Sequence, residues 1–244
     1  RNDMGLSIKK ILKQTDHRTW DYPKQPYSFY QEWNRALFFH WKVDAEVLQE
    51  LIADGLTIDL FNNEAYVSLV AFTMEKIRPR FLPPFAPISN FDEINLRTYV
   101  VKDDIPGVYF LNIEASKIIS VAVSKLLSVL PYEHADMYRN NKDYFQSVFK
   151  KKNFSFAAKY EIGTEITDKT DLDCFLTERY CLYVDADENL YRYDIHHIPW
   201  PLHQLTLYEL QTDYVLGDLN LNELPLKVQY SSGVQVIAWN KIQV

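Results

Sequence analysis

The stretch from Glu93 to Val100 carries the most concentrated set of reactive side chains in the sequence. Its polar and apolar residues alternate, and successive side chains of a β-strand point to opposite faces. One face is therefore polar and consists of Glu93, Asn95, Arg97 and Tyr99. A strand rises about 3.3 Å per residue, which places Glu93 and Arg97 roughly 13 Å apart along that face, too far for them to pair with each other. This face is either a solvated outer surface or the polar wall of a ligand cavity.

Each charged group on this face could do a definite kind of chemistry. Arg97 could hold a carboxylate or enolate oxygen, and Glu93 could act as acid, base or hydrogen-bond anchor. Tyr132 or His134 would complete the cavity wall, with His134 either a general base near neutral pH or a satisfied structural group. In the rival interpretation Glu93, Arg97 and Arg179 form a structural ion network inside a non-catalytic scaffold or regulatory protein. A cavity of about 300 Å³ or more on this face would distinguish ligand binding from a filled interior.

Other reactive residues give weaker signals. His196, His197 and His203 lie within eight positions, but the first two project to opposite faces if the strand continues, which argues against a shared metal ion. Cys174 and Cys181 have no neighbouring histidine and no glycine-rich elbow, which argues against a cysteine nucleophile. The sequence also lacks a glycine-rich phosphate loop. It predicts neither a metal nor a cofactor.

Charge and composition narrow the class of partner. The 244 residues include 26 basic and 33 acidic side chains, a net charge of −7, which argues against a binder of nucleic-acid phosphates. Two cysteines without CxxC spacing are typical of the reducing cytoplasm. The lack of an apolar run of about 18 residues argues against a membrane-spanning helix. We therefore expect a cytoplasmic protein that binds a small molecule rather than nucleic acid or membrane, with the oligomeric state left open.

The periodicity predicts a mainly β, α+β chain. Aromatic residues make up 15% of it and favour half-buried sheet surfaces. Helical spacing occurs over 6–15, from Asp44 as N-cap to Gly55, and over 114–129. We expect an N-terminal helix and lead-in loop (1–26) and one domain (27–244), an antiparallel sheet or barrel with two or three flanking helices. The predicted strands are 28–40, 65–76, 93–102, 108–113, 154–161, 178–185, 190–197, 204–211 and 233–242, with weaker candidates at 132–137 and 142–150.

Several of these segments together resemble one family. The blocks lie in a fixed order and cover residues from about 27 to the C-terminus: 38–44 (FFHWKVD), 65–72 (AYVSLVAF), 78–83 (RPRFLP), 91–100 (FDEINLRTYV), 177–180 (TERY) and 196–202 (HHIPWPL). They resemble the YqjF-like family, a domain of unknown function (DUF2071). That family is in turn similar to the acetoacetate decarboxylase-like superfamily. The resemblance implies a cone-shaped antiparallel barrel around a buried pocket.

The resemblance also bears on chemistry. The decarboxylases of that superfamily carry a proline followed by two lysines, one of which forms a Schiff base with the substrate. The matching motif in this sequence is Pro131-Tyr132-Glu133, which has no side-chain amine to form an imine. The resemblance therefore argues against decarboxylation by the lysine route and leaves open whether any reaction is catalysed. Glu93 corresponds to the superfamily's pocket glutamate. We expect a cavity for a small anionic or carbonyl-bearing ligand.

Overall fold

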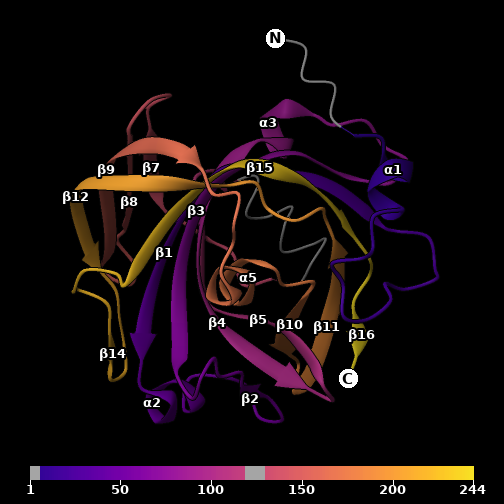
Figure 1. Ribbon diagram of the computed structural model, residues 1–244, viewed down its shortest axis with the longest axis horizontal. Helices are drawn as coiled ribbons and strands as arrows, with labels where there is room; N and C mark the ends of the chain where they lie inside the picture. Colours follow the sequence, from indigo (N-terminus) through magenta and orange to yellow (C-terminus); the bar gives the residue numbers. More distant parts are fainter. Residues whose placement is uncertain (1–5, 119–129) are drawn as a thin grey trace.

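A computed structural model describes residues 6–118 and 130–244 of the chain, and its main feature is one long, strongly curled sheet (Figure 1). The predicted mainly β architecture is confirmed. Neighbouring strands along this sheet follow the order β16 (Ile242–Gln243), β11 (Asn189–His196), β10 (Cys181–Ala186), β5 (Ile105–Ala115), β4 (Phe91–Lys102), β3 (Ala65–Pro79), β1 (Phe29–Val43), β15 (Lys227–Ala238), β12 (Leu202–Asp213), β9 (Phe154–Glu165), β8 (Tyr144–Phe149) and β7 (Asp136–Arg139). Two short strands pair outside this order, β2 (Thr57–Ile58) with β4 and β6 (Glu133–His134) with β5. β13 (Val215–Leu216) pairs with β14 (Leu219–Asn220) in a separate ribbon.

Part of the sheet curls until two strands that are distant in the strand order, β11 and β15, pair with each other. β11 pairs with β15 through Ile195 opposite Ala238 and His196 opposite Ile237. The strands β15, β1, β3, β4, β5, β10 and β11 therefore enclose a common interior. Most pairings are antiparallel, as predicted, but β5 runs parallel to β10 and to β6. These parallel pairs need long connections, and the chain between β5 and β10 spans more than sixty residues.

Both faces are buried along most of β3 and β4 and along the second half of β1, so the polar face of β4 is shielded from solvent as well as its apolar face. On the outer face Phe39 packs edge-on against Phe156 of β9, with ring centroids 5.2 Å apart. On the inner face Phe38 packs against Trp200, also at 5.2 Å. Each such side chain contributes roughly 1.5–3 kcal/mol when it is fully buried. The inner face surrounds the interior toward which the polar side of β4 points.

The first two predicted helices are present and shorter than expected. α1 (Ile8–Leu12) lies inside the predicted 6–15 segment and buries Ile11. α2 (Ala45–Gln49) begins after Asp44, whose side chain accepts a hydrogen bond from a backbone amide of the first turn. Gly55 has the expected positive φ of 84° but lies in a turn beyond the helix end. At the helix end the Gln49 side chain donates to the Leu56 carbonyl and accepts from the Ile58 amide of β2.

The third predicted helix, over 114–129, is wrong at its start. Glu114 and Ala115 are the last residues of β5 and pair with β4, while residues 119–129 lie outside the described part of the chain. Two helices were not predicted, α3 (Ala86–Ser89) and α5 (Asp171–Thr177). α5 lies inside the curl of the sheet (Figure 1) and begins with a capping box between Thr170 and Asp173. Among the described residues, none of the helices is long and apolar enough to cross a membrane.

Candidate functional site

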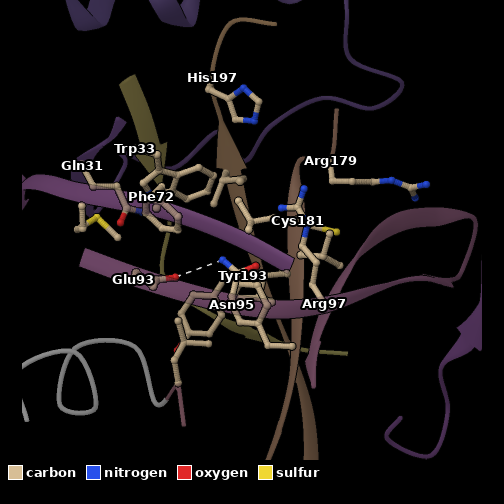
Figure 2. Close-up of a pocket in the computed structure, with 18 of the residues that line it drawn as sticks. Gln31, Trp33, Phe72, Glu93, Asn95, Arg97, Arg179, Cys181, Tyr193 and His197 are labelled. Atoms are coloured by element: carbon tan, nitrogen blue, oxygen red, sulfur yellow. Dashed lines mark hydrogen bonds between the residues drawn. The ribbon is translucent and has the colours of Figure 1, made fainter. Parts of the chain in front are cut away.

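The curled part of the sheet surrounds a cavity of about 120 Å³ (Figure 2). Its wall is mainly aromatic and aliphatic, with a small number of polar side chains from β1, β4 and the segments around β10 and β11. The volume is less than half the 300 Å³ or so that we expected. Aromatic rings such as Trp33, Phe72 and Trp200 line the wall and fill much of the interior. A cavity of this size fits a small ligand better than a large one.

Glu93 is the acidic group of this wall, and only 2% of it is exposed. The Tyr132 hydroxyl donates a hydrogen bond to its Oε2 at 2.9 Å. The Asn95 amide donates to its Oε1 at 3.3 Å (Figure 2). Burial raises the pKa of Glu93 from 4.5 to about 7, although both hydrogen bonds favour the charged form. Burial and the nearby carboxylate raise the pKa of Tyr132 as well, so its phenol stays a donor. The Glu93 carboxyl can therefore give or take a proton near neutral pH.

Arg97 is the cation of the same strand, and it is buried without an acidic partner among the described residues. One terminal nitrogen of its guanidinium donates to the backbone carbonyl of Leu176, at 3.1 Å. The Tyr99 hydroxyl donates to the same carbonyl, at 2.7 Å. α5 thus supplies the carbonyl that holds Arg97 in place, while the Arg97 Nε has no hydrogen-bond partner. The guanidinium of this cavity-lining residue therefore keeps one buried, unpaired donor.

Arg179 also lines the cavity, but its charge is directed elsewhere. Its guanidinium forms an ion pair with Asp59 and lies over the ring of Phe175, 4.2 Å from the centroid. In Figure 2 its side chain extends away from Glu93 and Arg97. The predicted network of Glu93, Arg97 and Arg179 is wrong, because Glu93 is satisfied by neutral donors and Arg179 by Asp59. The interpretation as a solvated outer face is also wrong, because Glu93 and Arg97 are buried.

Two further predicted site residues lie off the cavity wall. Tyr99 is fully buried on the same face of β4 as Arg97 but lies against α5, where it bonds to the Leu176 carbonyl. His134 is exposed and lies 3.6 Å from Asp136, so the expectation that it completes the wall is wrong. Tyr132 lines the cavity, where its hydroxyl donates a hydrogen bond to the Glu93 carboxyl. Of the predicted set, the structure places Glu93, Asn95, Arg97, Tyr132 and Arg179 around the cavity.

Four buried polar atoms without a hydrogen-bond partner lie in residues of this wall. They are the Asn95 Oδ1, Arg97 Nε, Trp33 Nε1 and His197 Nε2 atoms. A buried donor or acceptor left unpaired costs about 1–3 kcal/mol, so native proteins rarely keep several in one place. The cavity wall thus carries two unpaired donors, Arg97 Nε and Trp33 Nε1, and two unpaired acceptors, Asn95 Oδ1 and His197 Nε2. Sequence reasoning missed Trp33 and His197 as members of this site.

His197 has a defined protonation state in this position. Its Nδ1 lies 2.7 Å from the Ile198 carbonyl, which can only accept, so Nδ1 carries the hydrogen and Nε2 keeps its lone pair. Burial lowers the pKa of His197, which keeps the ring neutral. The adjacent His196 points the other way and contacts the Ile11 carbonyl through Nε2. The two adjacent histidines therefore point to opposite sides, as the strand alternation predicted, and only His197 lines the cavity. The described residues contain no cluster of three or more His, Cys, Asp or Glu side chains suited to a metal.

The curled sheet with its enclosed pocket defines an acetoacetate decarboxylase-like fold. The structure of acetoacetate decarboxylase from Legionella pneumophila superposes with a TM-score of 0.60 at 11% identity, covering 94% of both chains. The enduracididine biosynthesis enzyme MppR complexed with pyruvate superposes with a TM-score of 0.59 at 9% identity, covering 90% of this chain and 91% of the other. At such low identity these likenesses show the fold alone.

Sequence comparison then gives the family. The model of the DUF2071 family, described as an uncharacterized conserved protein, matches residues 30–235. The chain is also 40% identical to the uncharacterized protein YqjF of Bacillus subtilis (strain 168). The alignment spans 217 residues and covers 86% of this chain and 89% of the relative. This chain belongs to the DUF2071 family, and the family predicted from the sequence blocks is confirmed.

Proposed function

We propose that the cavity binds a small organic acid that carries a carbonyl group. The observation that carries this proposal is the state of Arg97, whose guanidinium is buried, borders the cavity and contacts only a neutral carbonyl among its described hydrogen-bond partners. A buried charge without a counter-charge is costly, typically by several kcal/mol. A ligand carboxylate would provide the missing charge and accept from the free donor of the guanidinium.

The other polar groups favour a second oxygen on the ligand. Trp33 has an unpaired N–H, which can only donate, and the Glu93 carboxyl is a donor when it is protonated. Both can therefore serve a carbonyl oxygen. The small volume of the cavity restricts the acid to a few carbon atoms. The structural neighbour MppR was solved in complex with pyruvate, a 2-oxo acid of this size, which supports the choice of pyruvate as a probe.

We further propose that binding does not proceed through a lysine imine. No lysine lines the cavity in the part of the chain that the structure describes. The family resemblance matches Tyr132 and Glu133 to the positions where the decarboxylases have lysines, and Tyr132 donates to Glu93. A phenol and a carboxylate form no Schiff base, so a substrate carboxylate at Arg97 would not be lost by that route.

Isothermal titration calorimetry with pyruvate and with acetoacetate tests the proposal. The wild-type chain should bind at least one of them, and Arg97→Met should abolish that binding. Arg139→Met is a matched control, because Arg139 also has an unpaired Nε but does not line the cavity. Its binding should equal that of the wild type. Absence of binding to the wild type, or unchanged binding to Arg97→Met, would refute the proposal.

A further inference from the structure

Two groups that can exchange protons line the cavity from different elements. Glu93 projects from β4 and has a pKa near neutrality, while His197 follows directly after β11 and keeps an unprotonated Nε2. Figure 2 shows the row of Glu93, Asn95 and Arg97 on one side of the pocket and the His197 ring on the other. A small ligand held at Arg97 would lie between an acid and a base.

We propose that His197 and Glu93 form an acid–base pair that moves a proton on the carbon next to the carbonyl group of a small 2-oxo acid, without a covalent intermediate. The proposal rests on the binding function proposed above and adds a reaction to it. Reactions of this class need a base at the carbon, a donor at the carbonyl oxygen and an anchor for the carboxylate. His197, Glu93 and Arg97 supply these three parts in that order.

The step balances without any additional reagent. The lone pair of His197 Nε2 takes a proton from the carbon, and the electron pair of the broken C–H bond forms the new carbon–carbon double bond. The carbonyl π electrons move to oxygen, which takes the proton of the Glu93 carboxyl. The product is the enol, with His197 as imidazolium and Glu93 as carboxylate. The reverse step returns a proton to the carbon from His197 and restores the acid form of Glu93.

The surroundings of both groups match these roles. The His197 ring packs against Tyr180 and Trp200, with centroids 4.8 and 5.6 Å apart, and its Nδ1–H is fixed on a carbonyl, so Nε2 has a set direction. Its backbone carbonyl is further held by the His17 ring at 2.8 Å. On the other side Tyr132 positions the Glu93 carboxyl. A purely structural histidine would have both ring nitrogens satisfied, as His196 does through Arg18 and the Ile11 carbonyl.

Hydrogen–deuterium exchange of the pyruvate methyl group in heavy water, followed by proton NMR, tests this inference. The wild-type chain should accelerate exchange over buffer, with a rate that saturates in pyruvate. His197→Asn keeps a donor for the Ile198 carbonyl but lacks Nε2, and Glu93→Gln keeps the acceptor for Tyr132 but lacks the proton. Each should lower the rate by about 100-fold or more, the usual contribution of general acid–base catalysis. The matched control His196→Asn should exchange like the wild type.

Pyruvate binding, measured by calorimetry on the same samples, separates the two proposals. His197→Asn, which leaves Arg97, Trp33 and Glu93 in place, should bind pyruvate within a few-fold of the wild type. If the wild type binds pyruvate but exchanges it no faster than buffer, the acid–base inference fails and the binding function stands. If the wild type does not bind pyruvate, both fail. If His197→Asn does not fold, an unchanged exchange rate in Glu93→Gln is sufficient to overturn the inference.

Discussion

Replacing Glu93 with glutamine should change how the stability of this protein depends on pH. Burial raises the pKa of Glu93 from 4.5 to about 7, so the folded state keeps a proton that the unfolded state has released between these values. Stability falls with rising pH wherever the folded state binds more protons. Glu93 therefore contributes fully below about pH 4.5, and its contribution is lost as the pH rises toward 7. Glutamine keeps the shape and an acceptor for Tyr132 but does not titrate.

The size of the effect follows from the two pKa values. With pKa values of 4.5 unfolded and about 7 folded, linkage gives a loss of about 2.5 kcal/mol in the free energy of unfolding between about pH 5 and pH 8. Because single domains are stable by only about 5–15 kcal/mol, this is a large part of the total. Relative to the wild type, Glu93→Gln should gain that amount over the same interval.

Urea unfolding of both proteins at about pH 5, 6, 7 and 8 measures this difference. Glu133→Gln is the flat control, because Lys151 and Lys152 outweigh the desolvation of Glu133 and lower its pKa from the ordinary 4.5. Glu133 is then ionised in both states throughout the assay, so the difference between wild type and Glu133→Gln should hardly change from pH 5 to pH 8. A difference between wild type and Glu93→Gln that stays constant from pH 5 to pH 8 would refute the raised pKa. It would also remove the argument that Glu93 is an acid near neutrality.

Three other expectations follow from the geometry. Gly107→Ala should lower the free energy of unfolding by about 1–3 kcal/mol, because the added Cβ would lie 2.6 Å from the Cys181 Sγ. Urea titration measures this, and an unfolding midpoint equal to that of the wild type would contradict the close packing at Gly107. His134→Ala should leave pyruvate binding unchanged and should change the free energy of unfolding by less than about 0.5 kcal/mol, because His134 is exposed. Loss of pyruvate binding in this variant would show that His134 belongs to the site. Borohydride with acetoacetate should leave the protein mass unchanged by mass spectrometry, whereas an adduct on any lysine would show an imine route.

The sequence predicts those parts of the site that depend on local periodicity. The alternation of β4 places Glu93, Asn95 and Arg97 on one wall, because side-chain direction in a strand has a period of two whatever its neighbours are. The same alternation separates His196 from His197. The mainly β architecture follows for the same reason, since most strands carry their own apolar pattern.

The remaining features depend on partners that are distant in the sequence. Tyr132 and His134 would share a face in a regular strand, but Tyr132 is held inward by Glu93 of β4 whereas His134 is exposed beside Asp136. Trp33 and His197 become site residues only when β1 and the end of β11 meet across the curled sheet. The ion network fails because Asp59, from the segment after β2, reaches Arg179. Local periodicity contains no information about contacts between residues that are distant in the sequence.

The most direct test of the binding proposal is a crystal structure of this protein grown or soaked with pyruvate. The structure should show pyruvate in the cavity, with a carboxylate oxygen at hydrogen-bond distance, about 2.7–3.2 Å, from the Arg97 guanidinium. Its carbonyl oxygen should lie toward Glu93 or Trp33. An empty or water-filled cavity at saturating pyruvate, or pyruvate bound with its carboxylate away from Arg97, would contradict the account.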